Sequence, residues 1–169
     1  DPFVITRSIS TYERSIISGN SKYDDYTLGK ALLSKEEMLG KVLFFSVKTN
    51  CSQCHSGFNF TNYEFKNNGL YEIYSHPGRF RLTQKESDVA MFKTPSLRNV
   101  GFTSPYMHDG SITTLENVVD HYNNGGKTHT HKSELIKPLG LTSIEKKALV
   151  AFLHTLDDNE LLTNPFLSE

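Results

Sequence analysis

The sequence has almost no cysteine, no long hydrophobic run and almost no net charge. No stretch approaches the roughly 20 apolar residues of a transmembrane helix, and no signal peptide is recognisable. The net charge of −1 over 169 residues gives no electrostatic reason to expect nucleic acid or a membrane surface as a partner. With 37% hydrophobic residues, the chain is long enough for one domain, or for a small domain with an arm.

The only two cysteines stand in the motif Cys51-Ser52-Gln53-Cys54-His55. This CxxCH pattern is the attachment signature of c-type haem. Two thiols separated by two residues can add across the two vinyl groups of one porphyrin, and the histidine that follows can then face the iron. Because both cysteines are used, none remains for a disulfide. The motif predicts one covalent haem c held by Cys51 and Cys54, with His55 as an axial iron ligand.

Two other kinds of site use the same residue types. A CxxC can be a thioredoxin-like redox pair, but that motif opens a helix after a strand, whereas residues 36–45 look helical. A structural zinc site needs four ligands. His129 and His131 could complete such a set with the two cysteines, although no second ligand pair of recognised spacing is present. Covalent haem is therefore the interpretation that we favour.

The pattern of apolar residues predicts a mainly α-helical chain, with no internal repeat and no clear strand. Residues 3–18 carry apolar side chains at helical spacing, and Gly19-Asn20 is a stop signal. Ser34 with Glu37 forms a capping box for a helix that runs into Phe44-Phe45, just before the CxxCH motif. A helix followed closely by CxxCH is typical of small c-type cytochromes.

A second capping box, Thr113 with Glu116, predicts a helix over residues 115–123. Asn124-Gly125-Gly126 should end this helix. Earlier in the chain, Asn67-Asn68-Gly69 is expected to form a turn.

A third capping box, Thr142 with Glu145, opens the last long helix. In small cytochromes the first and last helices cross, with a small residue on one against an aromatic residue on the other. Gly40 and Phe152 are the candidates for this crossing.

The side chain on the second face of the iron would decide what the haem does. A methionine would give a high-potential electron carrier, a histidine a lower-potential one, and an empty position would favour peroxide or gas chemistry. A tyrosine would stabilise ferric iron. Composition leaves this choice open, and the methionine and histidine candidates are Met91, Met107, His76, His108 and His121.

Three arginines, Arg79, Arg81 and Arg98, lie on either side of Lys93-Thr94-Pro95. They form either a solvated surface or contacts to the haem propionates, for which the planar fork of arginine is suited. Arg79 and Arg98 are the candidates for such propionate contacts.

Several long stretches resemble a single family, the bacterial di-haem cytochrome c peroxidases and the MauG group, in their C-terminal haem domain. The similarity covers nearly the whole chain, and its motifs are long and specific. The stretches that carry it are residues 92–100 (FKTPSLRNV), 103–110 (TSPYMHDG) and 115–120 (LENVVD), together with residues 10–21, 138–142 and 151–153.

The resemblance implies a mainly α, class I cytochrome c-like haem domain with long loops. Residues 1–22 would form a linker helix entering the domain, and residues 23–169 the domain itself. Related domains also contribute to a calcium site between two haem domains. The main-chain carbonyls of Thr103 and Pro105 match that site here, and oxygen ligands of this kind suit calcium.

The resemblance also indicates the second axial ligand. In peroxidases of the family, a methionine on the helix after the 103–110 segment ligates this haem, and MauG-type members carry a tyrosine there. The matching residue in this chain is Tyr122, so the implied axial pair is His55 and Tyr122. Neighbours on a helix point about 100° apart, so His121 and Tyr122 cannot both face the iron. Met107 and His121 remain the competing ligands.

Members of this family carry two haems, whereas this chain has one CxxCH motif. We therefore expect a fragment: the electron-transfer domain of an oxidoreductase that acts on hydrogen peroxide. It would relay electrons to or from a peroxidatic haem in an N-terminal partner domain, with a small redox protein as donor. A periplasmic location is expected, because haem is attached covalently outside the bacterial cytoplasmic membrane. The alternative is a stand-alone mono-haem c-type cytochrome that carries electrons.

Overall fold

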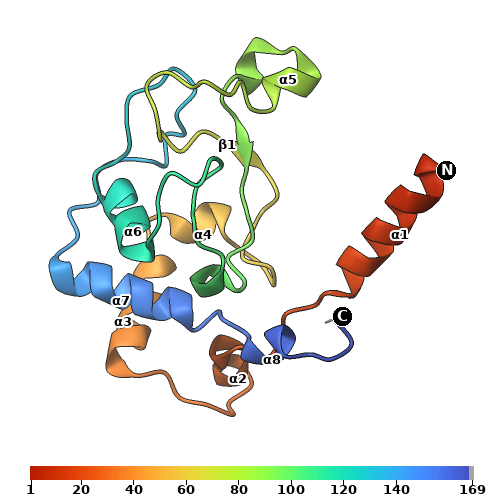
Figure 1. Cartoon of the computed structure of the whole chain (residues 1–169). Coiled ribbons are helices and arrows are strands. Elements are labelled where there is room, and N and C mark those ends of the chain that lie inside the picture. The colour runs from red at the N-terminus through yellow and green to blue at the C-terminus, as the bar shows by residue number, and fades with distance from the viewer. Residues whose placement is uncertain (168–169) are drawn as a thin grey trace.

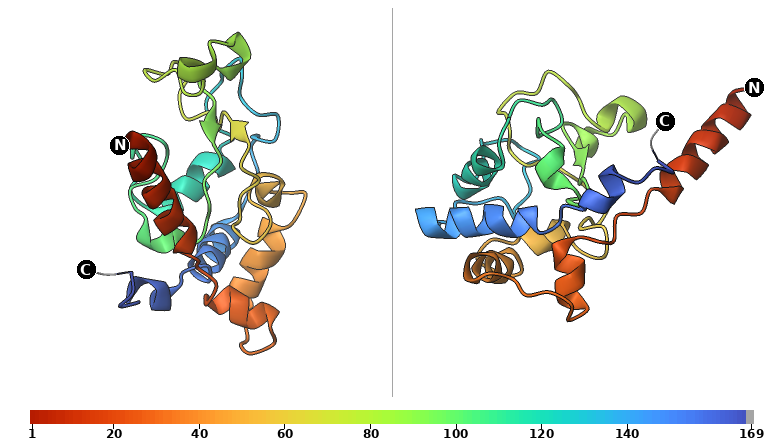
Figure 2. Two further views of the ribbon diagram at one scale, coloured as in Figure 1. Left: turned by 90° about the vertical axis from the view of Figure 1, so that its right-hand side faces the viewer. Right: turned by 60° about the horizontal axis from the view of Figure 1, so that its bottom comes forward.

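The computed structural model describes residues 1–167 as a helix-rich chain with very little sheet. The body is built around α3, α6 and α7, while α1 extends away from it (Figures 1 and 2). Within the described residues, no helix is long and apolar enough to cross a membrane. The α-helices are α1 (Pro2–Ser15), α2 (Lys22–Thr27), α3 (Lys35–Phe44), α4 (Cys51–Cys54), α5 (Phe80–Thr83), α6 (Leu115–Asn123), α7 (Ser143–His154) and α8 (Asn159–Leu162).

Helices α3 and α7 cross at Gly40, as predicted (Figure 1). A Cβ atom at this position would collide with the carbonyl oxygen of Ala148 and would lie 2.8 Å from Cβ of Phe152. Glycine is therefore required by the close approach of the two backbones. The crossing partner is the Ala148 carbonyl as much as the Phe152 side chain.

The core beside this crossing is aromatic. Phe44 and Phe152 are almost completely buried, with ring centroids 5.1 Å apart. Tyr23 packs edge-on against both Phe60 and Phe152, with centroids 5.5 Å apart in each case. Because Phe60 follows the CxxCH motif by five residues, this cluster ties the motif to the helices.

The capping signals were largely reliable. Ser34 with Glu37 caps α3 and Thr142 with Glu145 caps α7, each as a reciprocal capping box. The bounds of α6 are as predicted, but its N-cap was predicted one residue too early. Thr114 is the N-cap and accepts a hydrogen bond from the amide of Asn117, so no glutamate occupies the reciprocal position.

Two other expectations about secondary structure need correction. The first helix ends at Ser15, three residues earlier than predicted, because Ile16 is already extended. The polar stretch after it contains α2, which Ser21 and Asp24 open with an unpredicted capping box. A short antiparallel pair also exists, β1 (Phe65–Lys66) with β2 (Phe92–Lys93). Two residues per strand are too few for an alternating pattern to reveal them.

The Gly40 crossing gives a direct test of this packing. We expect Gly40→Ala to lower the free energy of unfolding by about 1–3 kcal/mol, the usual cost of overpacking a close contact. Chemical unfolding followed by circular dichroism measures it. Val42→Ala, on an exposed position of the same helix, is the control and should change stability by less than about 0.5 kcal/mol. Equal stability of the two variants would contradict the crossing.

Candidate haem site

The CxxCH motif forms a single helical turn, α4, so both thiols project from one short element. Asn50 precedes the turn in the left-handed conformation, with φ 56°, which asparagine tolerates better than most residues. The amide of His55 donates to the carbonyl of Cys51 over 2.9 Å and places the imidazole directly after the turn. Both cysteines are free and partly buried. Two thiols and an imidazole therefore come from five consecutive residues.

The His55 imidazole is oriented by one hydrogen bond. Its Nδ1 lies 3.1 Å from the carbonyl oxygen of Phe60. A carbonyl can only accept, so Nδ1 carries the proton and Nε2 keeps its lone pair. Burial lowers the pKa of His55, although the carbonyls of Phe60 and Pro95 oppose this effect. The ring is therefore neutral and presents Nε2 as a ligand atom, in the arrangement that most metal-binding histidines use.

The thiols do not have the character of a redox pair. Burial raises the pKa of both Cys51 and Cys54 above the usual value of a thiol. Thioredoxin-like cysteines depend on a lowered pKa and a reactive thiolate. The thioredoxin interpretation therefore has no support in this site, whereas the donor set fits a c-type haem.

Three side chains meet where the second axial ligand is expected. The amide nitrogen Nδ2 of Asn68 lies 3.4 Å from the hydroxyl oxygen of Tyr122 and 3.3 Å from Sδ of Met107. Burial raises the pKa of Tyr122, and the nearby Cys51 and Cys54 thiols raise it further, while the Asn68 contact lowers it. Once converted to thioethers, these cysteines no longer ionise, so that contribution ends when haem is attached.

His121 is turned away from this group. Its Nε2 lies 3.0 Å from the backbone carbonyl of Asn68, and its ring stands nearly perpendicular to that of Tyr122. The two neighbours on α6 thus point in different directions, in agreement with helical geometry. Of the two competing ligands, only Met107 shares the position of Tyr122.

The remaining ligand candidates lie among loop residues. The His108 ring stacks on Phe92 with centroids 3.8 Å apart, and His76 meets His108 edge-on. Met91 forms an isolated backbone bridge with Gly78. These contacts give each residue a packing role.

The histidines considered for zinc are already engaged. His129 Nδ1 lies 3.3 Å from the amide nitrogen of Asn67, and His131 Nδ1 lies 3.1 Å from the carbonyl of Val89. Among residues 1–167, no group of three or more histidine, cysteine, aspartate or glutamate side chains could hold a metal ion. The zinc interpretation is therefore not supported.

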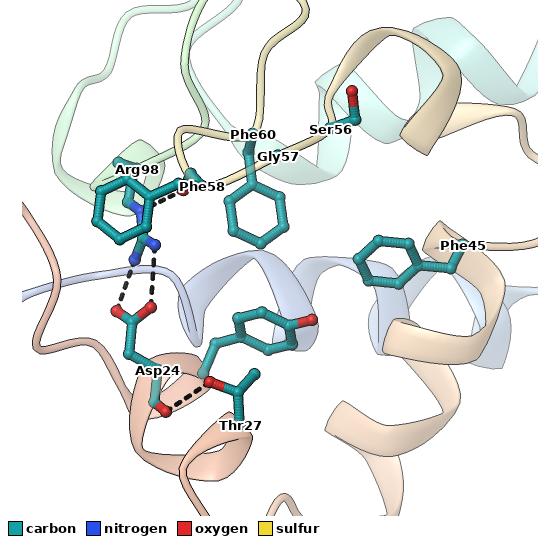
Figure 3. Close-up of a pocket in the computed structure, with 9 residues that line it drawn as sticks. Asp24, Thr27, Phe45, Ser56, Gly57, Phe58, Phe60 and Arg98 are labelled. Carbon is teal, nitrogen blue, oxygen red and sulfur yellow. Dashed lines mark hydrogen bonds and ion pairs between the residues drawn. The ribbon is translucent and has the colours of Figure 1, made fainter.

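A pocket of about 280 Å³ lies beside the attachment turn, between α2 and the segment that follows His55 (Figure 3). Phe45, Phe58, Phe60 and Tyr23 provide aromatic walls, and the Arg98–Asp24 pair lies at one end. The charged groups in the pocket are already paired with each other. We therefore interpret this pocket as part of the packing that supports the attachment turn.

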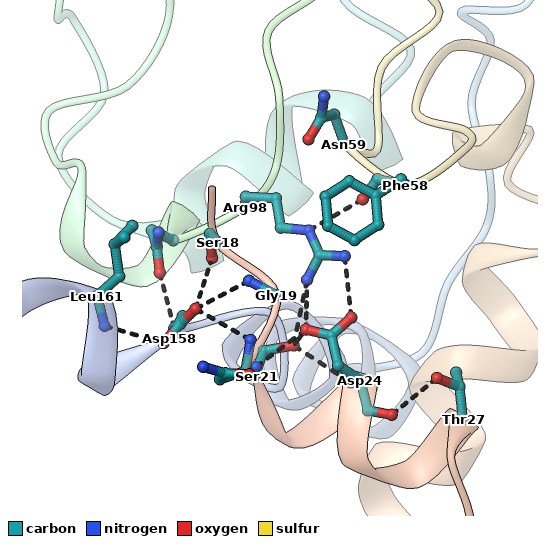
Figure 4. Close-up of polar contacts among 12 residues, drawn as sticks. Ser18, Gly19, Ser21, Asp24, Thr27, Phe58, Asn59, Arg98, Asp158 and Leu161 are labelled. Atoms are coloured by element: carbon teal, nitrogen blue, oxygen red, sulfur yellow. Dashed lines mark hydrogen bonds and ion pairs between the residues drawn. The ribbon is translucent and has the colours of Figure 1, made fainter. Parts of the chain in front are cut away.

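Arg98 anchors this region. Its guanidinium donates two hydrogen bonds to Asp24, of 2.6 and 2.9 Å, and a third of 2.9 Å to the carbonyl of Phe58 (Figure 4). Only 7% of its side chain is exposed. Burial alone would raise the pKa of Asp24, but the bonds from Arg98 and Ser21 outweigh it and hold that pKa below its usual value. A propionate contact by Arg98 would require this pair to break.

The Arg79 side chain is more exposed than that of Arg98. Its Nε lies 3.3 Å from Asp88, its guanidinium stacks on the Phe65 ring, and 41% of its side chain is exposed. Thr103 and Pro105, the calcium candidates, are both exposed. The propionate role of Arg79 and the calcium role of these two residues remain predictions.

Asp158 is a second anchor that the sequence did not reveal. Its Oδ2 accepts hydrogen bonds from Ser18 Oγ and from the amides of Gly19 and Asn20, of 3.0–3.1 Å (Figure 4). Its Oδ1 accepts one from the amide of Leu161. This carboxylate fastens the segment after α1 to α8. An aspartate that caps a four-residue helix is the only local signal, and it says nothing about a distant partner.

Comparison with models of known protein families finds no match. Among curated proteins, the chain is 36% identical to the cytochrome-c peroxidase IdrP1 of Pseudomonas sp. (strain SCT), over 92% of this chain and 50% of that protein. It is 37% identical to the methylamine utilization protein MauG of Methylorubrum extorquens, over 90% of this chain and 43% of that protein. The chain thus spans about half the length of these relatives.

A solved structure shows the same fold. The chain superposes on a MauG-like protein associated with microbial copper homeostasis with a TM-score of 0.86 and 36% identity. The match covers 89% of this chain and 52% of that protein. Together with the helix-rich architecture, this superposition supports a cytochrome c-like fold.

The Arg98 anchor can be tested by stability. We expect Arg98→Leu to lower the free energy of unfolding by about 2–3 kcal/mol, because it leaves the partly buried Asp24 carboxylate without its charged partner. Chemical unfolding at pH 7 measures this loss. Lys22→Met removes an exposed partner of Glu37 and should cost less than about 1 kcal/mol.

The pH dependence gives this test a second readout. Asp24 has a lowered pKa in the folded chain, so its contribution is present above the unfolded value of about 4 and is lost as pH falls through the folded value. The difference in the free energy of unfolding between the wild-type chain and Arg98→Leu should become smaller below about pH 4. A constant difference down to pH 2 would contradict the pairing.

Proposed function

Because the chain belongs to the di-haem cytochrome c peroxidase and MauG family, we propose that it is the C-terminal, electron-transfer haem domain of such an oxidoreductase. The complete protein would act on hydrogen peroxide. This domain would relay electrons to or from a peroxidatic haem carried by an N-terminal partner domain. A small redox protein would be the donor, and the periplasm would be the location, because covalent haem attachment takes place there.

The proposal is carried by two side chains: an oriented histidine and a partly buried tyrosine. His55 offers Nε2 because its Nδ1 is bonded to the Phe60 carbonyl. Tyr122 comes from α6, a separate element, and the Cys51 and Cys54 thiols of the attachment turn raise the pKa of its phenol. When bound, haem c supplies an iron that exchanges single electrons. His55 and Tyr122 would hold that iron, and the surrounding protein would limit the access of water.

Tyr122 suits a domain that works with oxidised iron. A phenolate is a hard, negatively charged ligand, which favours the higher oxidation state over the lower one. A thioether such as Met107 would favour the reduced state and a conventional electron carrier. The choice between these two side chains therefore separates a MauG-like role from simple electron storage.

The exposed face of α1 supports the presence of a partner domain. None of its residues is buried, and Phe3, Ile5, Ile9 and Tyr12 are all more than half exposed. An isolated helix of 14 residues is only marginally stable in water, so its apolar side chains need a surface to pack against. With half the length of the relatives unmatched, an N-terminal domain is the partner that we propose. Residues 1–22 would then act as the linker.

The axial pair is tested by the ferric spectrum of the haem-loaded chain with and without Tyr122→Phe. We expect a c-type Soret band without a sulfur-to-iron charge-transfer band, and a change in the EPR ligand field in the variant. Tyr63→Phe, the same change at an exposed tyrosine, should leave both spectra unchanged. A methionine-type band that survives Tyr122→Phe would reject tyrosine ligation.

The domain assignment has an independent test in the complete gene. A second CxxCH motif upstream in the reading frame, with two haems per full-length chain by pyridine haemochromogen assay, is the expected result. A complete product with a single haem would instead identify a stand-alone electron carrier.

A further inference from the structure

Asn68 occupies an unusual position, because its one free amide group faces both candidate ligand atoms. Its Nδ2 lies 3.3 Å from Sδ of Met107 and 3.4 Å from the hydroxyl oxygen of Tyr122. The side-chain amide carries two N–H groups and can donate one to each acceptor, although 3.4 Å is long for an N–H···O hydrogen bond. The thioether and the phenol thus approach the same point from different segments of the chain.

The orientation of this amide is fixed by its surroundings. Its Oδ1 accepts a hydrogen bond of 3.2 Å from the amide of Leu70, so Nδ2 is the atom that faces the ligands. The backbone carbonyl of Asn68 is held by His121 Nε2. Gly126 packs so closely that a Cβ atom there would lie 2.9 Å from the same carbonyl oxygen. Asn68 is therefore a rigid donor.

A rigid N–H donor stabilises the two ligands to different extents. An oxygen that carries negative charge accepts a charge-assisted hydrogen bond, roughly twice as strong as a neutral one. A thioether sulfur is only a weak acceptor. A buried charge is also costly unless it is hydrogen-bonded, and a phenolate carries such a charge where a thioether does not. The Asn68 amide thus favours ligation by Tyr122 over ligation by Met107.

We propose that Asn68 is a positioning residue that keeps Tyr122, and not Met107, as the sixth ligand of the haem iron, an inference that rests on the function proposed above. Met107 is then the alternative sixth ligand. It adopts φ 72°, a left-handed conformation that few non-glycine residues take, so the backbone accepts strain at the residue whose sulfur reaches Asn68. Without the Asn68 donor, the sulfur would replace the phenol oxygen.

The test compares ferric spectra of the haem-loaded wild-type chain, Asn68→Asp and Asn68→Asp/Met107→Leu. Aspartate keeps an oxygen for the Leu70 amide but replaces the donor by a negative charge. We expect a sulfur-to-iron charge-transfer band in Asn68→Asp, a shift of about tenfold or more toward sulfur ligation. The band should be absent from the wild-type chain and from the double variant. Asn117→Asp, at an exposed position on α6, controls for the added charge.

Asn68→Ser provides a second variant in case the aspartate prevents folding. Its hydroxyl can still accept from the Leu70 amide in a serine turn but is too short to reach Tyr122. The same sulfur band is expected. A tyrosine-ligated wild-type chain whose spectrum is unchanged in the variants, or which becomes five-coordinate without a sulfur band, would overturn the role of Asn68 and leave the His55/Tyr122 pair intact. A sulfur band in the wild-type chain would overturn both proposals.

Discussion

The close crossing of α3 and α7 at Gly40 is the constraint on which the rest of the structure depends. Glycine lets the α3 backbone meet the Ala148 carbonyl, and this contact fixes how α3 lies against α7. The attachment turn begins seven residues after the end of α3. Phe60, packed with Phe44 beneath the crossing, then fixes the carbonyl that orients His55. The packing of the two helices therefore helps to determine the direction in which the His55 imidazole points.

Beyond this crossing, polar anchors replace regular structure. Residues 56–112 contain only two short strands and a few single turns, so few ladder hydrogen bonds hold them. Buried side chains do this work instead: Thr61 Oγ1 donates to the carbonyl of Thr94, and the Asn67 amide donates to that of Ala90. Satisfied buried groups of this kind specify one conformation because any alternative leaves them unpaired. The long loop can therefore carry Asn68 and Met107 to defined positions.

Sequence reasoning succeeded where the signal is local. The caps of α3 and α7 and the end of α6 depend on residues within one turn, whereas the Gly40 crossing was expected from the pattern of small cytochromes. It missed contacts whose partner is distant. The bond from Arg98 to Asp24, 74 residues away, leaves no trace in spacing, and the propionate role of Arg98 stays a prediction. Asn68 was noted only as part of a turn, since its Nδ2 contacts depend on how two loops and α6 pack together.

A tyrosine ligand needs more stabilisation from the protein than a methionine ligand, because a phenolate is charged and a thioether is not. Burial raises the pKa of the Tyr122 phenol, so the protein environment alone opposes the phenolate that would bind iron. The positive charge of the iron and at least one hydrogen-bond donor must together offset this cost. Exchange of methionine for tyrosine on α6 would therefore be incomplete without a residue that contacts the oxygen. The fixed amide of Asn68 is placed to supply that hydrogen bond, and Met107 lies on its other side. The same fold therefore presents both a tyrosine and a methionine as candidate ligands.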